Sequence, residues 1–244
     1  MRKIKLVIEY DGYKYHGWQI QPNGITIQSV LEEKLRLITK KKTSVLVAGR
    51  TDAKVHAEAQ AAHFVTRSRM TPREFLRALN SVLPKDISIK KVEEVDSDFH
   101  ARKSAKGRIY RYTILNRDYP SALQRRYSWF IPQPLDLPAI RRAKKCLIGR
   151  HEFSAFRASG CEAESPVKEI YRIDIKRKGD FLELTFEGNG FVKYMIRNIV
   201  GTLVQVGKGQ LAAGQVAEIL ESRNRKLAGP TAPAYGLKLV KVIY

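Results

Sequence analysis

The sequence predicts an α+β fold of two ferredoxin-like (βαββαβ) halves, which form an extended antiparallel sheet with helices on one side. Two observations lead to this prediction. Up to residue 95, strand-like and helix-like segments follow the order β-α-β-β-α-β, the split βαβ plan. The rest of the chain repeats that order with insertions, although the two halves share no visible sequence similarity. The 244 residues suffice for two such domains, which we place at residues 1–105 and 106–244.

In the first half, strands are recognised by alternation and helices by spacing and caps. Residues 4–10 alternate charged and apolar side chains, as a half-buried strand does. Residues 26–38 carry apolar side chains at helical spacing. Thr71 is a favourable N-cap and Pro72 suits the first helical position, so a helix is expected from there to Pro84. The remaining strands are expected at 44–48, 59–65 and 87–95.

In the second half, a hairpin and a long apolar helix are the clearest features. The turn of the hairpin is Lys178-Gly179-Asp180, between strands at 170–177 and 181–187. Residues 191–206 are apolar almost all round, which predicts a buried helix. The other expected elements are strands at 108–115, 127–131 and 237–243 and helices at 137–148 and 213–221.

The charge balance predicts a polyanionic partner. Lysine and arginine number 45 against 24 acidic residues, which gives a net charge of +21. The excess is spread over both halves, so the folded body itself must be basic. The usual partner of such a protein is a nucleic acid, whose phosphates attract lysine and arginine. Two antiparallel sheets side by side also suit RNA, which sheet platforms bind by stacking and phosphate contact.

Several other kinds of site are not indicated. The two cysteines and five histidines do not occur at the spacing of metal ligands, so no metal site is expected. No glycine-rich phosphate loop is present, and therefore no nucleotide cofactor is expected. The sequence contains no apolar run of transmembrane length and enters directly into a strand, which predicts a cytoplasmic protein without a membrane partner.

Residues 48–57, A-G-R-T-D-A-K-V-H-A, hold the first candidate for catalysis. Asp52 lies among small residues in a loop between two expected strands, and Arg50 precedes it by two residues. A carboxylate held beside a cation stays ionised, as a nucleophile or a base requires. The alternative is that Asp52 only caps a short turn and that Arg50 contacts phosphate at the surface.

Tyr110 and Arg197 are the other candidates from residue type and position. In K-G-R-I-Y-R-Y, Arg108, Tyr110 and Tyr112 share one face of the expected strand, which suits base stacking and phosphate contact. The alternative for Tyr110 is an aromatic residue packed across strands. Arg197 lies in the middle of the expected apolar helix, where a charge needs a partner, and Asp52 is a candidate. The alternatives are an ion pair with another acid or a narrow exposed stripe.

The segment Tyr10-Asp11-Gly12, followed by H-G-W-Q-I-Q, combines turn residues with an aromatic residue and two glutamines. Such a loop contacts RNA in one interpretation and is a packed turn in the other. Both stay open on the sequence.

Taken together, the motifs resemble the tRNA pseudouridine synthase A family over nearly the whole chain. Seven segments in order carry the resemblance, and any one alone is weak. They are Y-D-G-Y-K-Y-H-G-W-Q-I-Q (10–21), A-G-R-T-D-A-K-V-H-A with Q-A-A-H-F, L-N-S-V-L-P-K-D-I (79–87), F-H-A-R (99–102) with R-I-Y-R-Y, H-E-F-S-A-F (151–156), G-N-G-F-V-K-Y-M-I-R-N-I-V-G (188–201) and A-P-A-Y-G-L-K-L (232–239).

The resemblance implies an activity, a partner and roles for particular residues. It implies a homodimer with a basic cleft for tRNA, which isomerises uridine to pseudouridine at tRNA positions 38–40 without a cofactor. Asp52 matches the catalytic aspartate, and Arg197 matches the residue that holds it. Arg50 matches an arginine that helps to flip the base, Tyr110 a tyrosine that stacks on the uracil, and Leu237 an apolar wall of the pocket.

One position departs from the family pattern. The family usually has glycine where this chain has Lys54, and glycine there indicates a turn that needs positive φ. Either lysine is strained there by about 1–2 kcal/mol, or the turn does not need glycine. A further alternative is that its positive charge, two residues from Asp52, contacts RNA phosphate.

Two other functions are weighed against this one. A non-catalytic RNA-binding protein explains the charge and the sheet plan equally well, but not an acid at the centre of a small-residue loop in a basic protein. A phosphodiesterase or nuclease is disfavoured, because the sequence has no cluster of carboxylates and histidines for metal or acid–base pairs.

Overall fold

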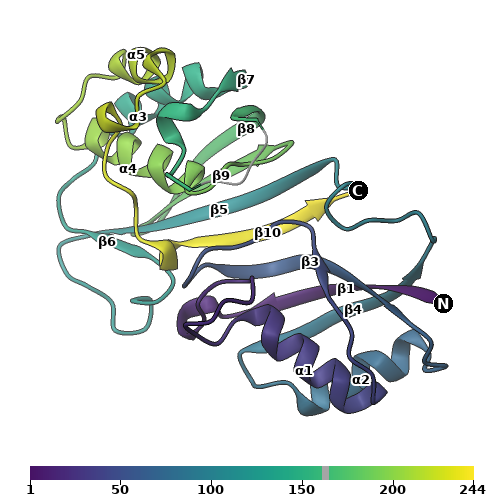
Figure 1. Ribbon diagram of the computed structural model, residues 1–244. Coiled ribbons are helices and arrows are strands. Elements are labelled where there is room, and N and C mark those ends of the chain that lie inside the picture. The colour runs from purple at the N-terminus through teal and green to yellow at the C-terminus, as the bar shows by residue number, and fades with distance from the viewer. Residues whose placement is uncertain (161–164) are drawn as a thin grey trace. The chain divides into compact units, whose positions relative to one another are not determined.

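The computed structural model describes residues 1–160 and 165–244, and the chain divides into two compact units (Figure 1). The first consists of Met1–Lys106 together with Lys238–Tyr244, and the second of Gly107–Leu237. The strands of each unit are mostly antiparallel and are combined with helices, which confirms the predicted α+β class. Residues 238–244 belong to the first unit rather than to the second half, because their strand pairs with a strand of the first unit.

The first unit follows the predicted β-α-β-β-α-β order, with one added strand. Its sheet has the order β4-β1-β3-β10, and β2 also pairs with β3. The strand β10 runs parallel to β3, whereas the other pairs are antiparallel. The strands are β1 (Arg2–Tyr10), β2 (Leu46–Val47), β3 (His56–Thr66), β4 (Ile87–Val95) and β10 (Leu237–Ile243). Only β2 is clearly shorter than the strand expected at 44–48.

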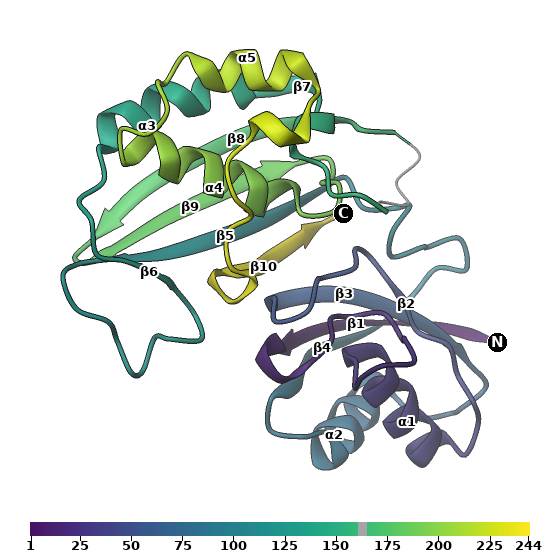
Figure 2. The same cartoon turned by 60° about the vertical axis from the view of Figure 1, so that its left-hand side comes forward.

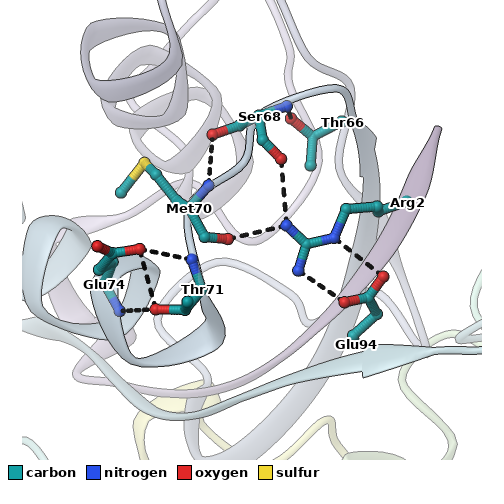
Figure 3. Close-up of polar contacts among 7 residues, drawn as sticks. All are labelled: Arg2, Thr66, Ser68, Met70, Thr71, Glu74 and Glu94. Atoms are coloured by element: carbon teal, nitrogen blue, oxygen red, sulfur yellow. Dashed lines mark hydrogen bonds and ion pairs between the residues drawn. The ribbon is translucent and has the colours of Figure 1, made fainter.

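Two helices, α1 (Ile27–Thr39) and α2 (Pro72–Val82), cover the same face of this sheet (Figure 1). Their buried faces meet alternate residues of the strands, and the rings of Phe64 and Phe75 contact edge-to-face at 5.6 Å. Both helices begin in a capping box, and Thr71 is the N-cap of α2 as predicted. At α2, the Thr71 hydroxyl accepts from the Glu74 backbone N–H, and the Glu74 carboxylate accepts from the Thr71 N–H at 2.6 Å (Figure 3).

Arg2 fastens the segment before α2 to the sheet (Figure 3). Its guanidinium donates two hydrogen bonds to the Glu94 carboxylate on the neighbouring strand, at 2.9 and 2.6 Å. The same group donates to the backbone carbonyls of Ser68 and Met70 at 3.2 and 3.0 Å. One side chain therefore joins β1, β4 and the connection from β3 to α2.

The second unit contains an antiparallel sheet in the order β5-β9-β8-β7. Its strands are β5 (Gly107–Asn116), β7 (Gly149–Glu152), β8 (Val167–Lys178) and β9 (Phe181–Gly188), and β6 (Trp129–Ile131) runs parallel to β5. The predicted hairpin is confirmed, and Gly179 has the positive φ of 57° that its turn requires. The strand β7 was not predicted.

Helices α3 (Leu137–Ala143), α4 (Met195–Gly207) and α5 (Gln215–Ser222) lie on one face of this sheet (Figure 2). Two helix boundaries differ from the prediction. The helix α4 begins at Met195 rather than at residue 191, because Tyr194 adopts φ 64° and interrupts the helical backbone. The helix α3 changes to a 3₁₀ turn after Ala143 instead of continuing to residue 148. No helix of residues 1–160 and 165–244 is long and apolar enough to span a membrane.

Candidate active site

Asp52 lies in the Asp52 loop, which we define as residues 49–55, between β2 and β3. Its side chain is half-buried and that of Arg50 is exposed. The backbone N–H of Val55 donates to the carbonyl of Asp52 at 3.2 Å and closes a tight turn. Asp52 is therefore a half-buried residue in a turn that a backbone hydrogen bond closes.

A second segment, residues 10–18, holds the Asp52 loop, and we call it the supporting turn. The Trp18 N–H donates to the Thr51 carbonyl at 3.0 Å, and the Lys54 N–H donates to the Tyr15 carbonyl at 3.2 Å. These bonds lie on both sides of Asp52. These two hydrogen bonds between strong backbone donors and acceptors hold the loop on both sides of the aspartate.

Two glycines allow this close approach. A Cβ atom on Gly12 would lie 1.9 Å from the Val55 carbonyl oxygen, and one on Gly17 would lie 2.7 Å from the Thr51 carbonyl oxygen. Gly17 also has φ 86°, a conformation that favours glycine. Of the two interpretations of this segment, the packed turn is therefore the one that the structure supports. The sequence does not identify this segment as support for Asp52, although its glycines indicate close backbone contact.

Lys54 has φ 66°, so this turn does adopt the left-handed conformation for which glycine is suited. Its side chain is exposed, and its ammonium lies 5.6 Å from the centre of the Tyr13 ring. The backbone at residue 54 is therefore left-handed, as glycine would allow, although the residue is a lysine.

Two titratable groups pack around the supporting turn. The Tyr15 hydroxyl donates to the Asp86 carboxylate at 2.6 Å, and burial together with that carboxylate raises the pKa of Tyr15. Nδ1 of buried His56 lies 3.2 Å from the Gly12 N–H and 3.0 Å from the Asp11 carboxylate. Nδ1 accepts from Gly12 only when it carries no proton, and bonds Asp11 only when it does. The two contacts therefore belong to different protonation states.

In the second unit, Tyr110 lies on β5 and is 8% exposed. Its ring meets that of Phe191 edge-to-face, with centres 5.4 Å apart. Tyr112 faces the same side, is fully buried and donates from its hydroxyl to the Pro233 carbonyl at 2.8 Å. Burial and Tyr235 raise the pKa of Tyr112. Tyr110 and Tyr112 therefore share one face of β5, as predicted, and both side chains are buried rather than on an open surface.

Arg197 is near the N-terminus of α4, not in the middle of the helix as expected. Its Nε donates to the Ala232 carbonyl at 2.8 Å, and the Ala232 N–H donates back to the Arg197 carbonyl at 3.1 Å. The guanidinium also lies 4.5 Å from the centre of the Tyr194 ring. These contacts fasten the segment before β10 to α4.

Leu237 is the first residue of β10 and is 6% exposed. The next residue, Lys238, is paired with His56 of β3 in the parallel register. The structure places Asp52 and Arg50 together on one loop of the first unit, and Tyr110, Arg197 and Leu237 in the second. The pairing of Asp52 with Arg197 stays a prediction.

The described residues contain no group of three or more histidines, cysteines, aspartates and glutamates that could hold a metal ion. Asp52 is the carboxylate that the sequence motifs single out, and Arg50 lies on the same loop.

Comparison with known proteins supplies the family. A family model described as tRNA pseudouridine synthase matches residues 6–102 and 143–244. The chain is 46% identical over 244 residues to a protein named tRNA pseudouridine synthase A from Acetivibrio thermocellus, and the match covers the whole of both chains. It is 43% identical to a protein of that name from Thermoanaerobacter sp., again over the whole of both chains. A third protein so named, from Myxococcus xanthus, is 46% identical, with all of this chain and 92% of the relative covered.

Proposed function

Because the chain belongs to the tRNA pseudouridine synthase family, it is an isomerase that converts uridine to pseudouridine in tRNA, and we propose that its targets are positions 38, 39 and 40 in the anticodon stem-loop. The support for these positions is the end-to-end resemblance of its motifs to the tRNA pseudouridine synthase A family. Family membership also disfavours the alternative of a non-catalytic RNA-binding protein.

Asp52 is the catalytic residue of this proposal. The reaction breaks the bond between uracil N1 and ribose C1′, turns the base and joins C1′ to C5. The proton on C5 is then lost and N1 gains one, so the product is an isomer and no redox cofactor takes part. The Asp52 carboxylate attacks C1′, adds to C6 or removes the 2′ proton to give a glycal. All three routes need an ionised carboxylate within reach of the substrate, and the half-buried position of Asp52 supports that role.

Arg197 is proposed to hold the Asp52 carboxylate in its ionised form. A cation beside a carboxylate lowers its pKa, which opposes the increase that an apolar pocket causes. Two hydrogen bonds with Ala232 fix Arg197 at the start of α4, which supports a fixed rather than a mobile partner.

The other three residues are proposed to act on the flipped base. Removing a uridine from its stack costs a few kcal/mol, which binding must offset. Arg50 is exposed and suited to fill the vacated space or to contact phosphate, Tyr110 stacks on the uracil, and Leu237 forms an apolar wall.

We also propose that the protein is a cytoplasmic homodimer in which the first unit carries the Asp52 loop and the second completes a basic cleft. The net charge of +21 supports phosphate contact. Such binding weakens steeply as the salt concentration rises.

The single observation that carries the proposal is the family motif around Asp52, on a loop that backbone bonds hold at both sides. The test is the Asp52→Asn variant with tRNA transcripts that carry tritium at C5 of the uridines at 38–40. Joining C1′ to C5 expels that tritium into water. We expect the wild-type enzyme to release tritium. We expect the Asp52→Asn variant to bind the tRNA but to release no tritium.

Asp180→Asn is the matched control, because this exposed carboxylate lies in a hairpin turn and pairs with Arg117. It should keep the wild-type rate of release. Normal release by Asp52→Asn would refute the role of Asp52. If the wild-type enzyme releases no tritium from label at positions 38–40 but releases it from label at other uridines, the proposed positions are refuted.

A further inference from the structure

Three polar side chains, Tyr10, Thr51 and Gln60, are buried together beside the Asp52 loop, with exposed fractions of 3%, 7% and 0%. Tyr10 ends β1, Gln60 lies within β3, and Thr51 directly precedes Asp52. The Tyr10 and Thr51 hydroxyl oxygens are 2.7 Å apart. The trio therefore reaches from the sheet to the residue next to the carboxylate.

Gln60 connects the trio to the other end of the loop. Its side-chain nitrogen donates to the Gly49 carbonyl at 2.8 Å and to the Tyr10 hydroxyl at 3.5 Å. Because an amide nitrogen only donates, Tyr10 accepts there and can donate its own proton to Thr51. The Asp52 loop is thus bonded to the sheet at Gly49 and at Thr51, one residue before and one after exposed Arg50.

The position of the trio in the sheet argues for a role beyond packing. Gln60 pairs with Ile8, and its neighbours Ala62 and Phe64 on the same face of β3 are buried and apolar. Burying polar groups in such a core costs free energy unless they are bonded, and apolar residues would fill the same space. The loop that the trio bonds is the one that carries Asp52.

We propose that Tyr10, Thr51 and Gln60 are positioning residues that set the orientation of the Asp52 carboxylate toward the ribose or the base of the substrate. The proposal rests on the proposed catalytic role of Asp52. The trio touches no substrate itself, because its members are buried. It acts through the backbone between Gly49 and Asp52, where a displacement of about 1 Å is enough to slow a reaction a hundred-fold.

The test separates the rate of the chemical step from tRNA binding. Tyr10→Phe and Thr51→Val each remove one hydroxyl and keep the shape of the side chain. We measure the single-turnover rate of tritium release with enzyme in excess, and the Kd for tRNA separately. We expect the rate to fall about ten- to a hundred-fold in both variants while the Kd stays unchanged. Thr51→Ser restores the hydroxyl and should restore the rate.

Tyr244→Phe is the matched control in the same unit. It also removes a tyrosine hydroxyl, but this hydroxyl donates to the Ala101 carbonyl at 2.9 Å and lies outside the trio. Its rate should equal that of the wild type. The double variant Tyr10→Phe/Thr51→Val should be no slower than the slower single variant, because each single change already breaks the bond between the Tyr10 and Thr51 hydroxyls.

The outcomes distinguish this proposal from the one it rests on. If Asp52→Asn is inactive and Tyr10→Phe and Thr51→Val keep the wild-type rate, the positioning role is refuted while the catalytic role stands. If the variants lose rate and tRNA binding in proportion, or if Thr51→Ser fails to restore the rate, the trio is only structural and the proposal is overturned. If Asp52→Asn is active, the catalytic role itself fails.

Discussion

The side-chain oxygen of Asn198 accepts a hydrogen bond from the Arg225 guanidinium at 3.0 Å, although Asn198 is completely buried in α4. The same oxygen accepts from the Thr231 hydroxyl at 2.6 Å, and the Asn198 amide nitrogen donates to the Phe156 carbonyl at 2.8 Å. Burial lowers the pKa of Arg225. One asparagine therefore joins α4 to the 3₁₀ turns at Ser154–Phe156 and Arg225–Leu227 and to Thr231.

Asn198→Ala should destabilise the second unit strongly. Removing the side chain leaves the buried partners without their bonds, and we expect a loss of about 2–4 kcal/mol in the free energy of unfolding. Urea unfolding monitored by circular dichroism measures it. Asn224→Ala is the control, because that exposed asparagine only caps a 3₁₀ turn through the Lys226 N–H. Equal losses in the two variants would contradict a special role for the buried site.

Lys54→Gly should stabilise the first unit. Lysine at φ 66° carries a conformational cost that glycine does not, and the extra freedom of glycine in the unfolded chain offsets part of the gain. We expect a net increase of up to about 1 kcal/mol in the free energy of unfolding. Lys54→Ala removes the same charge but keeps the strained backbone, so it separates the two effects. If the glycine variant unfolds at the same urea concentration as the alanine variant, the strain is absent.

The buried residue His63 should make the protein less stable in mild acid. Its pKa is lowered to about 4, first by burial and then by His100 and Lys3, and its Nδ1 accepts from the Ala101 N–H at 3.2 Å. In the unfolded chain the imidazole binds a proton near pH 6.5. Between these two values the unfolded state binds more protons, so stability falls as the pH falls from about 6.5 to about 4. Above this window the contribution of His63 is constant.

The measurement for His63 is urea unfolding of wild type and His63→Gln between pH 7.5 and pH 4. We expect the wild type to lose about 1–3 kcal/mol more than the variant over this range, because glutamine does not titrate. Parallel curves for wild type and His63→Gln would show that His63 does not titrate in this range.

The sequence predicts the elements of this fold best where side-chain patterns decide the structure. The helix α2 was recognised from its N-cap and proline, and the β8–β9 hairpin from its glycine turn. The strand β7 was missed because Gly149–Glu152 is short and has no alternation of polar and apolar residues. The start of α4 was placed four residues too early, because an apolar run does not indicate that the backbone at Tyr194 is left-handed.

The candidate site divides in the same way. Asp52 and Arg50 stood out through residue type and spacing, and the structure places both on one loop. The supporting turn did not stand out, because it holds that loop mainly through the backbone groups of Tyr15 and Trp18. Contacts between backbones are nearly independent of residue type, so only the glycines that they require appear in a sequence.

Because β10 pairs with β3, the sheet of the first unit cannot be completed until the second unit has been translated. Residues 1–106 leave the exit tunnel early, but part of the edge of β3 has no partner until residues 237–243 have been translated. The strand edge beside His56, four residues after Asp52, thus stays open to other chains while the whole second unit is made. The sheet of the first unit is therefore completed only after the second unit has been synthesised.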